Sequence, residues 1–402
     1  MIVRRSANLV FLIGIGQRVS QSMVMLLIPL WVLSKHGSPF ALGVDVAAVS
    51  VAPMILAIPI GAAADRLGSR RIVLVGALAA GLATVLSISV GNVWLFGFWQ
   101  MIAGLGRSAT WIGAQASVTK EKDEGNSKAR RIGWLSLSAQ LGNFAGPFLA
   151  GLLIARISIV AAFVVAAAAI GAISVYALAE ESEPQLKRDL STENSGGSAS
   201  VTKHFGRAFG LLKVPAFRLV ILGSMVRLVL IAVRNSFYVV FLHNLGWNPL
   251  EIGTVLSLGS AASAGAAAMT GALHSRFDTP KLFYISMFAM AISFSFVPLF
   301  SSFLLQTVSM VVFGIGNGLA QTSLISLLAK ATPRQDQGLA VGLRTSVNRA
   351  VQVSTPLIVG SLVTFVVLPT LLFSLGVLCV VSLIGSAWFF KGISNPGSEI
   401  VN

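Results

Sequence analysis

Six arginines lie inside long apolar stretches of this 402-residue sequence, where an ionised side chain is costly unless it meets a partner or water. They are Arg18, Arg107, Arg227, Arg234, Arg344 and Arg349. The same stretches contain one carboxylate away from their edges, Asp45, which is too few to neutralise the arginines. Because a guanidinium group binds carboxylate or phosphate oxygens through paired hydrogen bonds, this excess of arginine indicates a site for an organic anion.

Two of these arginines occupy equivalent places in an internal repeat. The halves of the sequence match at an offset of 209 or 210 residues, so Arg18, 19 residues before Gly37, corresponds to Arg227, 19 residues before Gly246. We expect both to face a cavity between the halves; the alternative is that they bond backbone carbonyls at helix breaks. Helical spacing places further polar side chains on the same faces. The candidate substrate-binding residues are Arg18, Gln21, Arg107, Arg227, Arg234, Tyr238 and Arg349.

Three other charged residues of these stretches receive separate interpretations. Arg344 lies within one turn of one membrane surface, and we expect it to have a structural role. Asp45 lies about one turn inside an apolar run, where it is either a favourable charge near a helix N-terminus or a protonatable group facing a vestibule. Glu251 is expected to cap a helix beside Pro249.

These residues must be positioned by helices that cross a membrane. The sequence is 55% apolar and 11% charged, against about 25% charged in a soluble domain, and its mean hydropathy is +0.83. Twelve apolar runs are long enough to cross a bilayer of ~30 Å. They lie near 8–33, 42–63, 72–91, 93–117, 132–155, 157–179, 217–242, 250–273, 281–300, 303–329, 341–366 and 368–390. The expected fold class is an all-α integral membrane protein.

The basic residues between the spans predict the orientation of the protein. Twenty-one lysines and arginines lie on the side that also holds both termini, whereas the other side holds only Lys35 and Arg156. Positive loops stay in the cytoplasm, so both termini are expected there. This distribution also explains the net charge of +15 without nucleic acid as a partner. We expect a protein of a bacterial inner membrane without a cleavable signal, because the first apolar run is a full span.

The apolar pattern is interrupted once, by an acidic, glycine- and serine-rich segment. The expected organisation is a six-helix bundle at 1–179, a cytoplasmic linker at 180–214 and a second six-helix bundle at 215–402. The end of the linker, 203–213, is expected to form an amphipathic helix on the inner leaflet. Duplication with unchanged topology relates the bundles by a pseudo-twofold axis along the membrane normal.

Two motifs connect this repeat to a known family. The loop after the second span, 61–71, reads GAAADRLGSRR, and the fifth span contains GNFAGPFLAG at 142–151. The first motif resembles the GxxxDRxGRR signature of the major facilitator superfamily, and the second is similar to the GxxxGPxxGG motif of its exporters. The resemblance implies twelve transmembrane helices and an acidic latch at Asp65. The gating residues that it implies are Gly61, Asp65, Arg66, Gly68, Arg70, Arg71, Gly142, Gly146, Pro147 and Gly151.

Catalytic chemistry has no support in the sequence. No phosphate-binding loop, dinucleotide motif or metal-ligand cluster is present, and one cysteine excludes a disulfide framework. We therefore expect no enzyme activity, no cofactor and no metal.

The sequence favours a secondary transporter that works by alternating access, is monomeric, and takes a small-molecule substrate among membrane lipids. Export of an organic anion or anionic amphiphile is the leading hypothesis, because an inside-negative potential favours outward movement of negative charge by about 2.3 kcal/mol per 100 mV. Proton coupling through Asp45 or anion exchange are variants of it. The alternatives are a proton-coupled multidrug antiporter, an importer or exchanger of organic anions, and a non-pumping protein such as a lipid scramblase.

Overall fold

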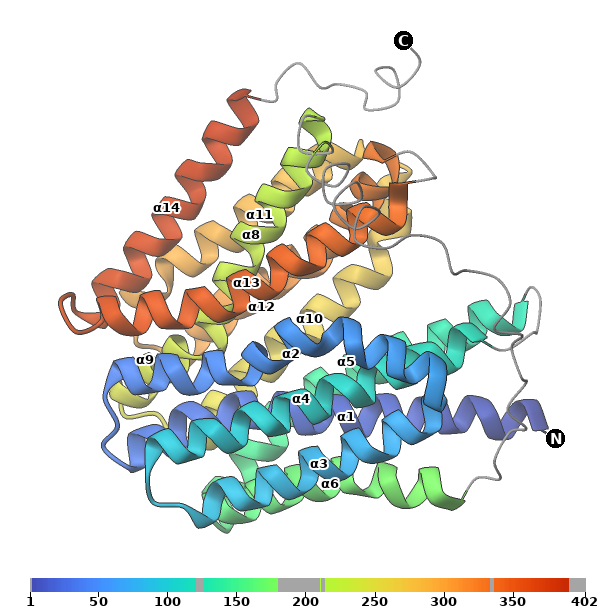
Figure 1. Cartoon of the computed structure of the whole chain (residues 1–402). Helices are drawn as coiled ribbons and strands as arrows, with labels where there is room; N and C mark the ends of the chain where they lie inside the picture. The colour runs from blue at the N-terminus through green and yellow to red at the C-terminus, as the bar shows by residue number, and fades with distance from the viewer. Residues whose placement is uncertain (1, 121–125, 180–209, 211–213, 333–335, 390–402) are drawn as a thin grey trace.

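The computed structural model describes residues 2–120, 126–179, 210, 214–332 and 336–389, and within these it is helical, with short turns between the helices (Figure 1). The first half contains α1 (Ile2–Ser34), α2 (Pro39–Leu67), α3 (Ser69–Ser89), α4 (Val93–Lys120), α5 (Asn126–Arg156) and α6 (Ile159–Ala179). The second half contains α8 (Pro215–Asn235), α9 (Phe237–Asn244), α10 (Pro249–His274), α11 (Thr279–Phe296), the short turn η2 (Val297–Leu299), α12 (Phe303–Ala331), α13 (Gln337–Leu362) and α14 (Leu368–Phe389). The predicted linker and its amphipathic helix fall almost wholly outside the described residues.

The twelve predicted spans are confirmed, with α8 and α9 together forming the seventh. Among the described residues, nine of these spans are long and apolar enough to cross a membrane by length and composition alone, and α4, α6 and α13 are the other three. The eleventh predicted span, α13, is not among the nine, and it carries Arg344 and Arg349 together with several amides and hydroxyls. These polar side chains lower the mean hydropathy of α13.

Equivalent signals start the second helix of each half. Ser38 accepts a hydrogen bond from the backbone of Ala41 at the start of α2, where Pro39 occupies the first turn. Asn248 and Glu251 form a reciprocal capping box at the start of α10, behind Pro249. The expected capping role of Glu251 is confirmed, and the two starts follow the repeat seen in the sequence.

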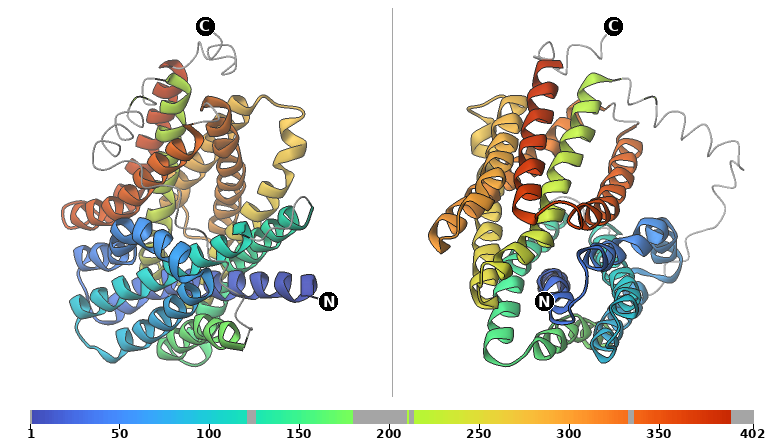
Figure 2. Two further views of the ribbon diagram at one scale, coloured as in Figure 1. Left: turned by 45° about the vertical axis from the view of Figure 1, so that its right-hand side comes forward. Right: turned by 90° about the vertical axis from the view of Figure 1, so that its left-hand side faces the viewer.

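The two halves meet along two helix pairs and diverge elsewhere. Helix α2 packs against α13, and α5 packs against α10, so each half contributes one helix to each contact. Figure 1 and the left view of Figure 2 show the halves separating toward the ends where α1 begins and α14 finishes. We call these ends the inner side, after the predicted orientation, and the opposite ends the outer side.

Glycines make the outer contacts close and symmetric. A Cβ on Gly43 of α2 would overlap the carbonyl oxygen of Pro356 in α13, and a Cβ on Gly253 of α10 would overlap that of Pro147 in α5. These pairs occupy equivalent places in the repeat. Backbone therefore packs directly on backbone where the halves touch, which closes the outer side in this conformation.

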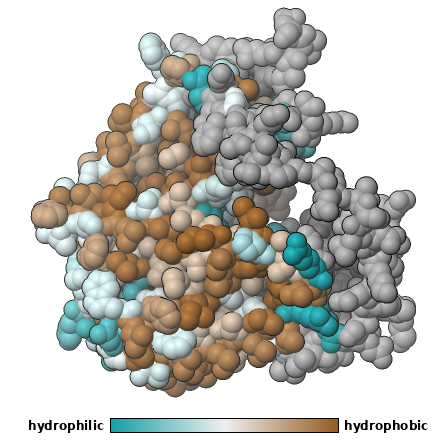
Figure 3. Space-filling model, in the orientation of Figure 1, coloured by the Kyte–Doolittle hydropathy of each residue, from teal (hydrophilic) through white to brown (hydrophobic). Residues whose placement is uncertain are grey.

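The rest of the surface is apolar. Figure 3 shows one face on which hydrophobic side chains cover most of the described residues. Individual apolar side chains such as Ile58, Leu82 and Trp388 are largely exposed. An apolar exterior of this extent suits lipid rather than water, so the protein is integral to a membrane.

Candidate functional site

Arg227 is held at the centre of the second half by two amides. Its Nε donates a hydrogen bond to Oδ1 of Asn317 at 2.9 Å, and its Nη2 donates to Oε1 of Gln321 at 2.9 Å. Asn317 is anchored in turn by donating to Ser263 of α10 at 3.0 Å. These contacts hold the guanidinium plane of Arg227, a residue of α8, against α12. They do not neutralise its charge.

Arg344 of α13 lies beside Arg227. Its Nε donates to the hydroxyl of Ser224 at 3.0 Å, and Ser224 precedes Arg227 by three residues on α8. Residues at this spacing are neighbours on one helix face, so the two arginines are adjacent and repel each other. The structure thus brings Arg344, for which the sequence favoured a structural role, to the predicted site.

Arg18 occupies the matching place in the first half. Its guanidinium carbon lies 3.9 Å from the centre of the Trp111 ring of α4, which is a close cation–π contact. Its Nε is buried and has no hydrogen-bond partner among the described residues. Arg349 of α13 lies within electrostatic range and repels it across the interface of the halves.

Arg18, Arg227, Arg344 and Arg349 form what we call the central arginine group. Within the described part of the chain, no ion pair joins any of the four to a carboxylate. Two unit charges ~6 Å apart repel by about 3 kcal/mol at an effective dielectric constant near 20. The group is therefore electrostatically incomplete and suited to an anion.

Further polar side chains lie on the same helices. Gln21 and Asn348 are half-buried, Gln115 is exposed, and Asn348 Oδ1 has no partner among the described residues. Gln352 accepts a hydrogen bond from Ser50 at 3.4 Å, which joins α13 to α2. These amides can take part in ligand binding or in contacts between the halves.

The hydrogen bonds of Arg107 stay within the first half. The Arg107 side chain is almost fully buried, its Nη2 donates to Gln100 at 3.3 Å, and Gln100 donates to Ser87 of α3 at 3.0 Å. The backbone carbonyl of Arg107 accepts a 3.4 Å hydrogen bond from Gln17. Arg107 therefore connects α4 with α1 and α3 in this conformation.

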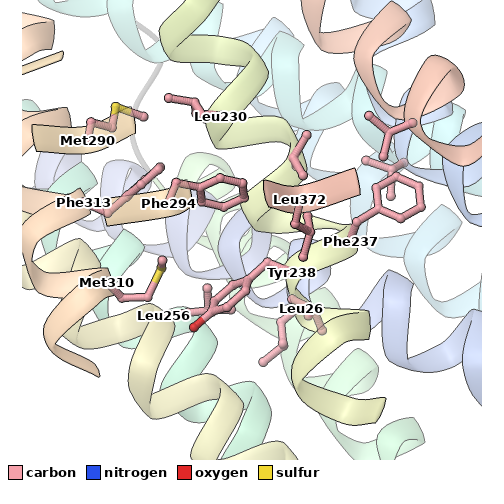
Figure 4. Packing of buried hydrophobic residues seen from close by; sticks show 14 of the residues in the cluster. Leu26, Leu230, Phe237, Tyr238, Leu256, Met290, Phe294, Met310, Phe313 and Leu372 are labelled. Atoms are coloured by element: carbon pink, nitrogen blue, oxygen red, sulfur yellow. The ribbon is translucent and has the colours of Figure 1, made fainter. Parts of the chain in front are cut away.

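Arg234 and Tyr238 bracket the break between α8 and α9. The Nη2 of Arg234 donates to the backbone carbonyl of Leu256 at 2.7 Å, and its guanidinium carbon lies 5.6 Å from the Phe313 ring. The hydroxyl of Tyr238 donates to Gln306 at 3.0 Å within a cluster of apolar side chains (Figure 4). In this conformation Arg234 and Tyr238 therefore bond groups of α10 and α12 within their own half.

Asp45 is fully buried between α2 and α4. Neither carboxyl oxygen has a hydrogen-bond partner among the described residues, and a Cβ added to Gly97 of α4 would overlap Oδ1. Burial of an unpaired carboxylate is strongly unfavourable. This environment favours the neutral, protonated form of the Asp45 side chain over the charged one.

The fifth-span motif has two structural functions. Gly142 and Gly146 bring α5 against α1, where a Cβ would overlap Arg18 and Ser22, and the Ser22 hydroxyl donates to the Gly142 carbonyl at 2.9 Å. Pro147 and Gly151 instead contact α10 of the other half. One motif therefore positions Arg18 and also closes the outer side.

The loop motif lies at the inner end of α2. Gly68 has a φ of 90°, which a side chain would strain, and this turn starts α3 directly after α2. Arg66 and Arg71 are exposed, whereas no neighbour would meet a Cβ on Gly61. The side chain of Asp65 falls outside the described part, so the predicted latch is not tested. Arg70, the remaining arginine of this motif, is also engaged in an interaction with another group.

The sequence predicted Asn317 and Gln321 as polar lining with mainly structural hydrogen bonds, but Trp111 and Ser224 were not predicted. The repeat carried a signal for Trp111, because position 111 corresponds to position 321. Trp111 under Arg18 thus matches Gln321 beside Arg227. Unlike residue types hide this equivalence, because an indole face and an amide oxygen both attract a guanidinium group.

Two six-helix halves around a polar centre define a class of integral membrane transporters. The family model of the Major Facilitator Superfamily matches residues 10–243 and 220–400, and the chain belongs to this superfamily. It is therefore a transporter for a small molecule rather than an enzyme.

Individual relatives are distant. The Escherichia coli protein "Tetracycline resistance protein, class B" is 24% identical over 323 residues, which cover 79% of this chain and 77% of that protein. A mutant of the nucleoside transporter NupG superposes with a TM-score of 0.81 at 13% identity, covering 97% of this chain and 100% of that one. A bacterial homologue of the human lysosomal transporter Spinster, in an inward-facing and unoccupied conformation, gives 0.77 at 14% identity over 99% and 98%. The solved structures establish the shared fold.

Proposed function

We propose that this transporter exports an organic anion or anionic amphiphile, which it binds at the central arginine group. One observation carries the proposal: Arg344 lies beside Arg227, Arg349 is within electrostatic range of Arg18, and none of the four pairs with a carboxylate in the described part of the chain. A bound anion removes the repulsion within these pairs. Trp111 supplies an apolar face beside the charge, which suits an organic rather than an inorganic anion.

The same charges link binding to movement. Arg18 and Arg349 belong to different halves, so their repulsion opposes approach of the halves on the inner side. An anion between them replaces repulsion with attraction and favours closure around the substrate. Binding thereby changes the relative stability of two conformations, which is the requirement for alternating access.

Export is supported by two independent arguments. A transporter that confers resistance removes its substrate from the cell, and a tetracycline resistance protein is related to this chain. The inside-negative potential also favours anion export by about 2.3 kcal/mol per charge per 100 mV. With the predicted orientation, an outer side closed by Gly43 and Gly253 leaves the arginine group to be loaded from the cytoplasm.

A thermal-unfolding comparison tests the proposal. The purified protein is mixed with benzoate and phenylphosphonate as anions, benzyl alcohol as the neutral analogue and benzylammonium as the cation. An anion at 100 times its Kd stabilises by about 2.7 kcal/mol. We expect stabilisation by the anions, loss of that effect in Arg18→Gln and Arg227→Gln, and no loss in Arg276→Gln, whose arginine is exposed on the inner side.

Two results would contradict the anion site. Stabilisation by benzylammonium alone would point to cationic substrates. An undiminished response to the anions in both Arg18→Gln and Arg227→Gln would place the anion elsewhere.

Proton-coupled multidrug efflux is the second candidate, and Asp45 supports it. The Asp45 carboxyl group is buried toward the closed outer side. If it is protonated there, it can release its proton when the outer side opens to water. Uptake of tetracycline into inverted membrane vesicles under an imposed pH gradient tests this idea. The candidate predicts uptake in the wild type and in Glu251→Gln, and loss in Asp45→Asn; uptake that persists in Asp45→Asn would exclude Asp45 as the coupling group.

A further inference from the structure

We propose that the substrate carries two separate anionic groups, one bound between Arg18 and Arg349 and the other between Arg227 and Arg344. This inference rests on the proposed function and adds the substrate's charge pattern. It also gives Arg344 a binding role that its position in the sequence did not suggest.

The first subsite lies where the halves face each other. Arg18 comes from α1 and Arg349 from α13, and the Trp111 ring covers one face of the Arg18 guanidinium at 3.9 Å. The ring leaves the edge of that guanidinium for hydrogen bonding, and Nε has no partner among the described residues. An anionic group at the guanidinium edge would therefore sit beside an aromatic surface.

The second subsite belongs to the second half alone. Asn317 and Gln321 accept from Nε and Nη2 of Arg227, while Ser224 accepts from Nε of Arg344. These acceptors are neutral, so they orient both guanidinium groups and leave two adjacent positive charges. Such a fixed pair is a preorganised site for a carboxylate or phosphate.

Helix geometry keeps the two subsites apart. Arg344 and Arg349 are five residues apart on α13, which corresponds to a rise of about 7.5 Å and a rotation of about 140°. Arg344 reaches α8 through Ser224, whereas Arg349 acts on Arg18 of α1. The two pairs thus have different partners and different attachment points on α13, and a substrate with one anionic group for each pair would neutralise both.

Matched pairs of mono- and dianions test the proposal in thermal-unfolding titrations of the full-length protein. Benzoate is compared with terephthalate as rigid probes, and hexanoate with adipate as flexible ones. We expect at least one dianion to bind tenfold or more tightly than its monoanion. In Arg344→Gln that advantage should disappear while monoanion binding remains, which also shows that the variant is folded; in Arg276→Gln the advantage should persist.

The outcomes separate this inference from the proposed function. Equal affinities for monoanion and dianion in both pairs would overturn the two-subsite arrangement and leave a single anion site intact. An unchanged dianion advantage in Arg344→Gln would likewise overturn it. Failure of all four anions to stabilise the wild type would refute the anion site itself, and this inference with it.

Discussion

The strongest structural prediction concerns the two glycines that close the outer side. In Gly43→Ala the new methyl group would overlap the Pro356 carbonyl, and in Gly253→Ala it would overlap that of Pro147. The obstructing atoms are backbone atoms, which cannot rotate away as the end of a side chain would. Overpacking of this kind costs about 1–3 kcal/mol at each site.

The cost applies only while the halves are in contact on the outer side. Each substitution should therefore shift the equilibrium toward the outer-open conformation by roughly 5- to 150-fold. The two contacts lie on different helix pairs and share no residues, so their effects should add in the double variant.

Distance measurements between spin labels provide the assay. Labels at Lys35→Cys and Thr364→Cys report on the outer side, because both positions are exposed and belong to different halves. The wild type should show mainly short distances, and Gly43→Ala and Gly253→Ala should populate longer ones. Gly61→Ala on α2 and Gly265→Ala on α10 are matched controls, since a Cβ at either position meets no atom within 4 Å.

The result that refutes the reasoning is equally specific. If the Gly43→Ala and Gly253→Ala distributions match those of the Gly61 and Gly265 controls, the backbone contacts do not hold the outer side closed. The same conclusion follows if only one variant of the symmetric pair responds.

Two further substitutions test structural assignments. Arg234→Met should lower the free energy of unfolding by about 1–3 kcal/mol, because the charged hydrogen bond from Arg234 to the Leu256 carbonyl is lost, yet anion-induced stabilisation should remain. Loss of anion binding at unchanged stability would instead show that Arg234 binds the anion. Gly142→Ala should weaken anion binding, because the methyl group would displace Arg18 on α1, and titration with benzoate measures this; unaltered benzoate affinity would show that α1 relaxes without moving Arg18.

The fold could be predicted from the sequence because a lipid environment allows few backbone structures. Apolar runs must form helices when no water satisfies the backbone, and this predicted the twelve spans within a few residues of their observed bounds. The break between α8 and α9 at Ser236 was not predicted. It involves no proline at the break, and its stability comes from distant partners such as Leu256 and Gln306.

The site could be predicted only in part. The sequence identified Arg18 and Arg227 through the repeat, and it marked Asp45 as an unusual carboxylate. It could not separate the arginines that face one another from Arg107 and Arg234, which make structural contacts. Depth along a helix follows from residue number, but the neighbour of a side chain depends on how helices pack.

The sequence by itself determined the number of spans, the duplication and the excess of intramembrane positive charge, because each follows from composition or from spacing along one chain. Only the tertiary structure decided that Arg344 joins Arg227, that Trp111 covers Arg18, and that glycines close the outer side. These relations connect residues from different helices. They depend on the rotation and approach of whole helices, which one-dimensional periodicity does not specify.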